Sequence, residues 1–199
     1  MKLISITGPD GSGKSTQAKL LAASLPGSRI VSVWDVIKRP EFKPERIYLS
    51  SPKVEEYVTD LHPFSRSLFI FHAFNEAYEK ALTSSAKYLI FDGYWYKYWA
   101  VEKAMGAPAL LEDVLKEQYR TPDYNFYIDL PVGHILKRKK QYSVYETAKA
   151  KDKMNAFMKI QTEVIEILRR LMPKNTLRLD GSQMPEVIHQ QISHIINAS

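Results

Sequence analysis

The sequence contains no cysteine. That absence excludes a disulfide scaffold, a cysteine nucleophile and any metal site built from thiolates. Long apolar runs are missing too, since no stretch approaches the roughly 18 residues that a membrane-spanning helix requires. Gly8 and Pro9 end the first apolar run too early for a secretion signal. These absences predict a soluble, cytoplasmic protein without a membrane anchor.

The chain also lacks several catalytic arrangements. Its five histidines show no metal-ligand spacing, and no nucleophile is paired with a base. Positive charge is in moderate excess, because 28 lysines and arginines against 22 acidic residues give a net charge of +6. This excess suits a polyanionic partner, which can be a nucleotide, a nucleic acid or an acidic membrane surface.

Short apolar segments alternate with helical patterns along the chain. Strands are predicted at residues 3–6, 29–33, 87–91, 124–130 and 176–179. Helices are predicted at residues 14–25, 65–82, 96–105, 109–119, 132–140, 152–171 and 185–196, with loops and one or two short helices within 35–63. This order predicts an α/β fold with three α/β/α layers and a mainly parallel five-stranded sheet. Ligands of such a fold bind at the carboxyl ends of the strands. Because no repeat or linker is evident, residues 1–199 predict a single domain.

One motif points to phosphate binding. Residues Gly8 to Ser15 fit G-x-x-x-x-G-K-[ST], directly after a predicted strand and at the start of a predicted helix. In such a loop the backbone N–H groups hold phosphate oxygens, Lys14 reaches the β- and γ-phosphates, and Ser15 offers a hydroxyl to Mg²⁺. The predicted nucleotide-binding set is Gly8, Asp10, Gly11, Ser12, Gly13, Lys14, Ser15 and Thr16. The plain alternative is a glycine-rich turn with a solvated Lys14.

A carboxylate follows the third predicted strand. At that strand end, Asp92 can hold Mg²⁺ through water or orient the acceptor, so Ser15 and Asp92 form the predicted metal-binding pair. The alternative is an aspartate that only caps its loop.

Two segments resemble the thymidylate kinase family of P-loop kinases. They are Gly8 to Gln17 and Thr121 to Pro131, and chain length and element order agree over nearly the whole chain. The resemblance implies ATP and Mg²⁺ as cofactors and direct in-line phosphoryl transfer to a nucleoside monophosphate, dTMP to dTDP in that family. It also implies that Asp10 meets a sugar hydroxyl of the acceptor.

The acceptor side departs from the family pattern after the third strand. Asp92-Gly93-Tyr94 stands where the family has Asp-Arg-Tyr, and Lys97 replaces a serine. The resemblance implies Tyr94 as an acceptor contact. It implies Lys97 as a partial replacement for the missing arginine charge, with a solvated lysine as the alternative.

A second departure lies in the helix at 65–82. The resemblance gives Phe69 or Phe71 the role of stacking on the acceptor base, although a place in the core competes with that role. The family arginine of this helix is also missing. The resemblance implies Arg39 as the remaining arginine for an acceptor phosphate, with Arg46 and Arg66 as weaker substitutes that are expected at the surface.

A basic segment at residues 137–153 occupies the place of the family's mobile lid. Arg138 is its only arginine, and it is predicted to act with Lys14 and Asp92 in catalysis by neutralising phosphate charge. The alternatives are a solvated basic helix end and a nucleic-acid patch, which lacks an aromatic platform. The resemblance places the turn at 180–182 beside the adenine, and the alternative is a plain turn before a helix.

The sequence therefore predicts a P-loop nucleotide kinase with nucleotide substrates and with neither a nucleic-acid nor a membrane partner. Two alternatives stay open. One is a related kinase acting on a nucleoside or another small molecule, which the missing arginines favour. The other is a nucleotide-binding protein with little catalysis, which the intact Lys14, Ser15 and Asp92 oppose. A homodimer is also left open.

Overall fold

The structure is a computed structural model that describes residues 1–34 and 51–198. Its sheet has five parallel strands in the order β2-β3-β1-β4-β5. They are β1 (Lys2–Thr7), β2 (Ser28–Val31), β3 (Tyr88–Asp92), β4 (Tyr124–Asp129) and β5 (Leu177–Asp180). Ile4 of β1 pairs with Ile90 on one side and with Tyr124 on the other, so β1 is the central strand. The predicted sheet is confirmed, although β2 ends two residues earlier than expected.

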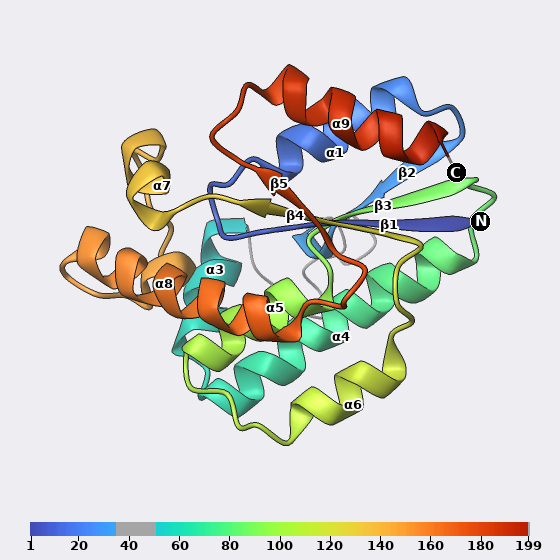
Figure 1. The fold of residues 1–199 in the computed structure, drawn as a ribbon. Helices are drawn as coiled ribbons and strands as arrows, with labels where there is room; N and C mark the ends of the chain where they lie inside the picture. The colour runs from blue at the N-terminus through green and yellow to red at the C-terminus, as the bar shows by residue number, and fades with distance from the viewer. Residues whose placement is uncertain (35–50, 199) are drawn as a thin grey trace.

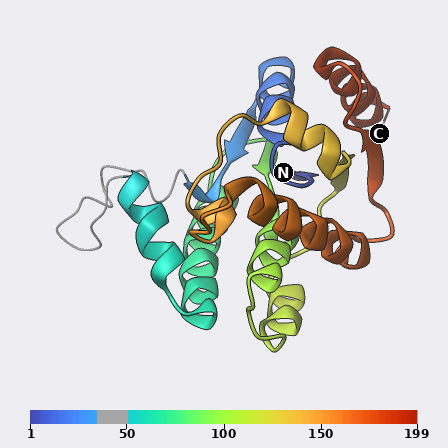
Figure 2. The same cartoon turned by 90° about the vertical axis from the view of Figure 1, so that its left-hand side faces the viewer.

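Helices cover both faces of this sheet. In the described residues they are α1 (Lys14–Ser24), α3 (Ser51–Asp60), α4 (Pro63–Leu82), α5 (Trp95–Ala104), α6 (Leu111–Gln118), α7 (Val132–Arg138), α8 (Lys153–Leu171) and α9 (Pro185–Asn197), with a short 3₁₀ helix, η2 (Tyr145–Thr147). α1 and α9 pack together on one face, and α4, α5 and α8 cover the other (Figure 1). Figure 2 shows the same layers from the side, with α3 beside α4. The three-layer α/β/α architecture predicted from the sequence is confirmed.

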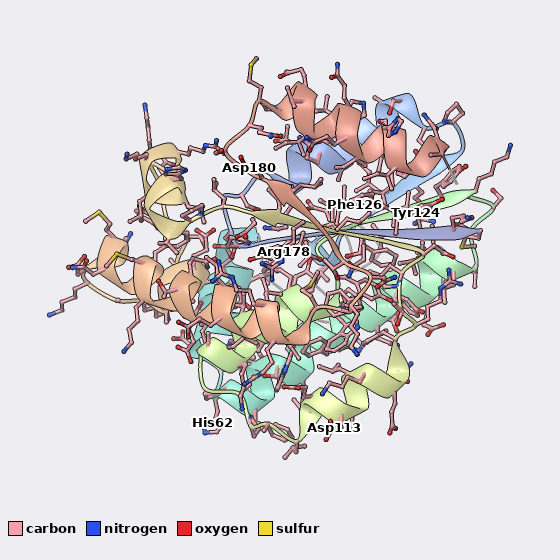
Figure 3. All side chains as sticks on the ribbon, viewed as in Figure 1. His62, Asp113, Tyr124, Phe126, Arg178 and Asp180 are labelled. Atoms are coloured by element: carbon pink, nitrogen blue, oxygen red, sulfur yellow. The ribbon has the colours of Figure 1, made fainter. Side chains whose placement is uncertain are left out.

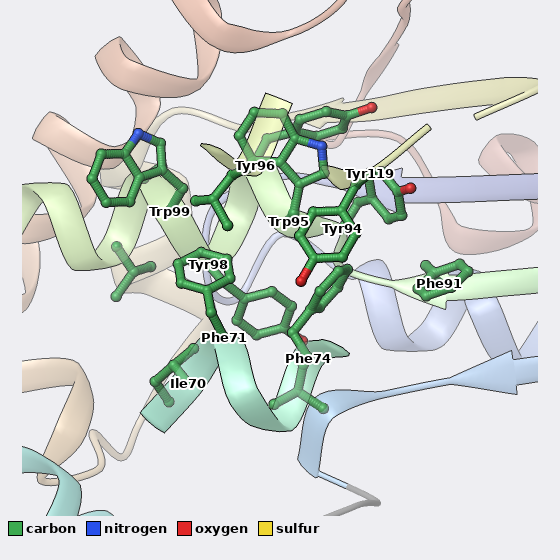
Figure 4. Close-up of a cluster of buried hydrophobic side chains, with 14 of the residues drawn as sticks. Ile70, Phe71, Phe74, Phe91, Tyr94, Trp95, Tyr96, Tyr98, Trp99 and Tyr119 are labelled. Carbon is green, nitrogen blue, oxygen red and sulfur yellow. The ribbon is translucent and has the colours of Figure 1, made fainter. Parts of the chain in front are cut away.

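The core between the sheet and helices α4, α5 and α8 is largely aromatic. The Phe74 ring of α4 lies 5.7 Å from the Tyr94 ring and 4.9 Å from the Tyr119 ring, both edge-to-face (Figure 4). Trp99 of α5 is fully buried in the same cluster. Aromatic side chains bury large apolar areas, so this packing holds α5 firmly against the sheet. The charged residues of α5 therefore have fixed places in the molecule.

Parallel pairing brings the carboxyl ends of all five strands to one edge of the sheet. Tyr124, at the start of β4, and Asp180, at the end of β5, mark the two opposite edges in Figure 3. The loops after β1 and β3 meet at the edge marked by Asp180, which is where the sequence places its phosphate loop and Asp92. No helix in the described parts of the chain is long and apolar enough to cross a membrane.

Candidate active site

The loop between β1 and α1 has the backbone of a phosphate cradle. Gly11 and Gly13 have φ values of 85° and 103°, which L side chains rarely adopt. A Cβ on Gly8 would lie 2.6 Å from Ser12 Oγ, so the loop is too tight there for another residue. Gly13 is the N-cap of α1 and supplies no side-chain cap, which leaves the first N–H groups of this helix available to a ligand.

Ser12 adds a second sign that the loop fits an anion. Its Oγ is buried and has no hydrogen-bond partner among the described residues. A buried polar atom without a partner is costly, and a phosphate oxygen would satisfy it. The loop therefore fits the phosphates of a nucleotide.

Lys14 is built into this loop. Its side chain is only 9% exposed, and Nζ donates a 2.8 Å hydrogen bond to the Pro9 carbonyl oxygen. The Asp10 carboxylate lies 3.6 Å from the same nitrogen. Burial lowers the pKa of Lys14, and the nearby Asp10 opposes that shift. The alternative of a solvated Lys14 is therefore wrong.

Asp10 connects the loop to α5 and α8. Its Oδ1 lies 3.0 Å from Nζ of Lys97, and its backbone N–H donates a 2.9 Å hydrogen bond to Gln161 Oε1. Burial alone would raise the pKa of Asp10, but the ammonium groups of Lys97 and Lys14 outweigh it and hold this pKa well below its usual range. Asp10 is thus a carboxylate fixed between two cations.

Ser15 and Asp92 form the second fixed pair. Ser15 Oγ donates a 2.6 Å hydrogen bond to Asp92 Oδ2 across the gap between α1 and the end of β3. A hydroxyl and a carboxylate are oxygen ligands of the kind that Mg²⁺ takes, together with water and substrate phosphates. In the described residues no group of three or more acidic or histidine side chains forms a complete metal site. Ser15 and Asp92 therefore have the chemistry to hold Mg²⁺.

Two cavities meet at Asp10. The first, of about 380 Å³, is called here the phosphate-loop cavity, and residues of the loop, α1 and β3 line it. The second, of about 410 Å³, is called the lid cavity, and its walls include Glu55, Lys139, residues 141–143, Tyr145 and Glu146. Four residues line both cavities: Asp10, Trp34, Lys97 and Glu146. A group held in one cavity can therefore approach a group held in the other.

Arg138 lies at a third cavity, of about 420 Å³, on the other side of the phosphate loop. Its Nη1 donates a 2.9 Å hydrogen bond to the Gly181 carbonyl oxygen. Gly181 belongs to the turn that was expected beside the adenine, and it also lines this cavity. In this conformation Arg138 contacts that turn and lines neither of the two cavities that meet at Asp10.

Three predicted acceptor contacts lie elsewhere. Tyr94 is fully buried and donates its hydroxyl to the Arg120 carbonyl oxygen, so it is a core residue and cannot touch a substrate. Phe71 is also in the core, packed near Trp99. Phe69 is partly buried with its ring edge-to-face to Tyr57 and lines neither cavity. These aromatics are needed for packing because α4 and α5 share one apolar interface.

The arginine predictions have different outcomes. Arg39 and Arg46 lie outside the described residues. Arg66 is 4% exposed and donates a 2.9 Å hydrogen bond from Nε to Glu102 Oε2, so its expected place at the surface is wrong. Lys97, by contrast, lies in the site and is buried, which excludes the alternative of a solvated lysine.

Several residues of the site could not be found by motif. Trp34, Gln161 and Glu146 stand in no recognisable pattern, and only the fold brings them to Asp10. Lys139 lies in the basic segment at residues 137–153, where the sequence predicts Arg138 as the catalytic residue. Its Nζ is 2.9 Å from Glu146 Oε1, and it lines the lid cavity.

The segment between α7 and α8, residues 139–152, is called here the lid segment. Tyr145 and Thr147 are buried, and the Tyr145 hydroxyl donates to Glu102 of α5. Lys149 forms an ion pair with Asp60 at the end of α3. This segment therefore packs across α3 and α5, beside the lid cavity. The motion predicted for it stays a prediction.

A family model described as thymidylate kinase matches residues 6–192. The chain belongs to the thymidylate kinase family. It is therefore a phosphotransferase of the nucleotide kinase type. No curated protein is similar enough in sequence to match it.

Solved structures of the same fold include kinases of two kinds. A thymidylate kinase from Candida albicans is 20% identical with a TM-score of 0.72, over 99% of this chain and 91% of that one. A deoxyadenosine kinase from M. mycoides, with dCMP and dCDP bound, is 16% identical with a TM-score of 0.71 over the whole of both chains. A thymidylate kinase from Ehrlichia chaffeensis is 19% identical with a TM-score of 0.65, over 98% of each chain. At these identities the likeness shows the fold.

Proposed function

We propose that this protein transfers the γ-phosphoryl group of ATP to a nucleoside monophosphate, with dTMP as the first candidate and dTDP as its product. One observation carries the proposal. The phosphate-loop cavity, which contains Lys14 and the Ser15–Asp92 pair, shares a wall with a second cavity of similar size. A donor and an acceptor can each have a cavity, and the shared wall is the place of transfer.

On the donor side, the chain supplies N–H groups, one buried ammonium and two oxygen ligands. The loop and the start of α1 bind phosphates through backbone N–H groups, and Lys14 adds a positive charge close to them. Ser15 and Asp92 would hold Mg²⁺. The bound ion supplies neutralisation of phosphate charge. The protein contributes positioning and electrostatic stabilisation, with no covalent intermediate.

On the acceptor side, the lid cavity offers both aromatic and polar surfaces. Trp34 and Tyr142 can lie against a base, and Asp10 can accept a hydrogen bond from a sugar hydroxyl. We propose that the basic segment at residues 137–153, which contains Arg138 and the lid segment, completes the site when the substrates are bound. Arg39 remains a candidate for the acceptor phosphate.

A second function, phosphorylation of a nucleoside, has its own supporting observation. Both lysines that line the lid cavity are paired with carboxylates, Lys97 with Asp10 and Lys139 with Glu146. Among the described residues that line this cavity there is no arginine. An acceptor without a phosphate would need no further positive charge there. The shared fold with a deoxyadenosine kinase agrees with this candidate.

An acceptor screen separates these functions. Purified protein is incubated with ATP and Mg²⁺ and with dTMP, dCMP, thymidine or deoxyadenosine in turn, and ADP and phosphorylated products are measured. Turnover of dTMP with inert nucleosides supports the proposal, and the reverse pattern supports the second candidate. Tight ATP binding with no turnover of any acceptor would contradict both. The Lys14→Met variant is the control, because turnover by this protein, unlike turnover by a contaminating kinase, must be lower in that variant.

A further inference from the structure

Lys97 lies where the two cavities meet. Its side chain is 9% exposed and projects from α5, whose aromatic packing fixes its place. Asp10, Trp34 and Glu146 are the other residues that line both cavities, and none of them is a cation. In the parts of the chain that the structure describes, Lys97 is thus the cation shared by the two cavities.

The ammonium of Lys97 is held and still able to donate. Asp10 Oδ1, at 3.0 Å, accepts from one of its three N–H groups. The ring of Tyr98 lies 5.1 Å from Nζ and gives a further favourable contact for the positive charge. Within residues 1–34 and 51–198 no second acceptor lies on this nitrogen, so its other N–H groups can donate to oxygens that enter either cavity. A positive group held in place before substrate arrives needs no reorganisation during reaction.

The other cations near the site have different positions. Lys14 donates to the Pro9 carbonyl and lines the phosphate-loop cavity. Lys139 is paired with Glu146 and lines the lid cavity. Arg138 donates to Gly181 at the third cavity.

From this geometry we infer that Lys97 is a catalytic residue that binds the phosphoryl group during its transfer, with Asp10 as the positioning residue that holds it at the junction of the cavities. The inference rests on the proposed function. An oxygen of the acceptor phosphate dianion forms a bond to the γ-phosphorus, and the bond from that phosphorus to the β,γ-bridging oxygen breaks. The bonding electron pair leaves with ADP, and no proton is transferred. The N–H donors of Lys97 stabilise the charge on the oxygens of the transferred group.

The kinetic test compares Lys97→Met with Lys97→Arg. Removal of one preorganised donor of this kind costs about a hundredfold or more in kcat, so Lys97→Met should lower kcat for ATP and dTMP by about a hundredfold. Lys97→Arg keeps the charge in a larger, planar group, so it should retain more kcat than Lys97→Met without reaching the wild type. Lys103→Met is the matched control on the same helix, because that ammonium lies near the Trp99 ring away from both cavities. Thermal unfolding shows whether each variant is folded.

Kinetics also distinguishes other roles. A rise in KM for dTMP at unchanged kcat would make Lys97 a ground-state ligand of the acceptor and would overturn the inference. A hundredfold loss in Lys139→Met together with normal kcat in Lys97→Met would assign the role to Lys139 instead. Asp10→Asn should lower kcat less than Lys97→Met, because the lysine remains and only its anchor is lost. A larger loss in Asp10→Asn would contradict this division of roles.

A binding measurement tests Lys97 without any turnover. ADP and β,γ-imido-ATP differ by the terminal phosphate, so calorimetry with both reports contacts to that group. Lys97→Met should weaken imido-ATP about tenfold and ADP less than threefold. An equal effect on both nucleotides, or no effect, would overturn the inference even if the enzyme is active. If no acceptor is phosphorylated but Lys97→Met weakens imido-ATP more than ADP as expected, the proposed function fails while the phosphate contact of Lys97 is supported.

Discussion

The hydroxyl of Tyr145 donates a 2.6 Å hydrogen bond to Oε1 of Glu102. Glu102 is fully buried, and its other oxygen accepts from Arg66 at 2.9 Å and from Ser67 at 3.2 Å. Burial and the adjacent carboxylate raise the pKa of Tyr145, so this hydroxyl stays a donor at neutral pH. A buried carboxylate of α5 thereby anchors the lid segment.

We expect Tyr145→Phe to lower the free energy of unfolding by about 1–3 kcal/mol. The change removes one donor from a buried, ion-paired acceptor while the ring can keep its packing. Urea unfolding measures the effect. The control is Tyr142→Phe, since the partly exposed Tyr142 packs its ring near Phe157 and should change stability by less than about 0.5 kcal/mol. Equal stability of all three proteins would contradict the anchoring role.

Arg66→Met should be more destabilising, by about 3–5 kcal/mol. It leaves the Glu102 carboxylate buried without its cation, and a buried ion pair that loses one partner is strongly destabilised. Arg66→Met combined with Glu102→Gln should recover part of the loss, because the neutral amide can accept from Tyr145 through its oxygen and donate to Ser67 Oγ through its NH₂ group. The loss in free energy of unfolding is measured for both single variants and for the double variant. If the loss in the double variant equals or exceeds the sum of the two single losses, Arg66 acts by packing and not by charge.

Asp10 should make stability depend on pH in acid. Its pKa in the folded protein is held below the ordinary 3.8 by Lys97 and Lys14, so its carboxylate stabilises the fold above that pH. That contribution is lost as the pH falls from 3.8 toward the lowered pKa. We expect wild type to be more stable than Asp10→Asn by a constant amount above about pH 5, with the two curves converging in acid.

The exposed Asp113 provides the comparison for this experiment. Its carboxylate is 87% exposed, and Asp113→Asn should change the urea midpoint little at any pH. A constant difference between wild type and Asp10→Asn down to pH 2 would contradict the lowered pKa of Asp10.

The sequence predicts some parts of this molecule well because their physical causes are local. The spacing of Gly8, Gly13 and Lys14 follows from the tight backbone of one loop, and the strands follow from short apolar runs. The resemblance predicts Tyr94 and Phe71 as acceptor contacts, yet their place depends on how α4 packs on α5. The polar contacts of Arg66 with Glu102 and of Asp10 with Lys97 join residues far apart in the chain, and no local pattern records such pairs.

Ser15 and Asp92 should set the requirement for magnesium. Ser15→Ala removes the hydroxyl ligand and Asp92→Asn removes the negative charge of the carboxylate, so each should raise the Mg²⁺ concentration for half-maximal turnover by about tenfold. Turnover is measured while Mg²⁺ is titrated at fixed ATP. Ser24→Ala, at the far end of α1, is the control and should leave the titration unchanged. If both site variants reach half-maximal turnover at the wild-type Mg²⁺ concentration, Ser15 and Asp92 do not bind the metal.

Lys14→Met should lower kcat/KM for ATP by at least tenfold, which is about 1.4 kcal/mol of transition-state stabilisation. The expected loss follows from the place of Lys14, whose buried ammonium is held by the Pro9 carbonyl inside the phosphate loop. The stability of the nucleotide-free protein should change by less than about 1 kcal/mol, because the lost contact with Asp10 is offset by the removed cost of burying a charge. Asp10 also keeps Lys97 as its partner. Lys19→Met is the matched control, since that lysine is exposed on the same helix and should leave both quantities unchanged. Steady-state kinetics and thermal unfolding of the three proteins decide the outcome. Equal turnover in Lys14→Met and Lys19→Met would show that the loop does not bind the donor phosphates.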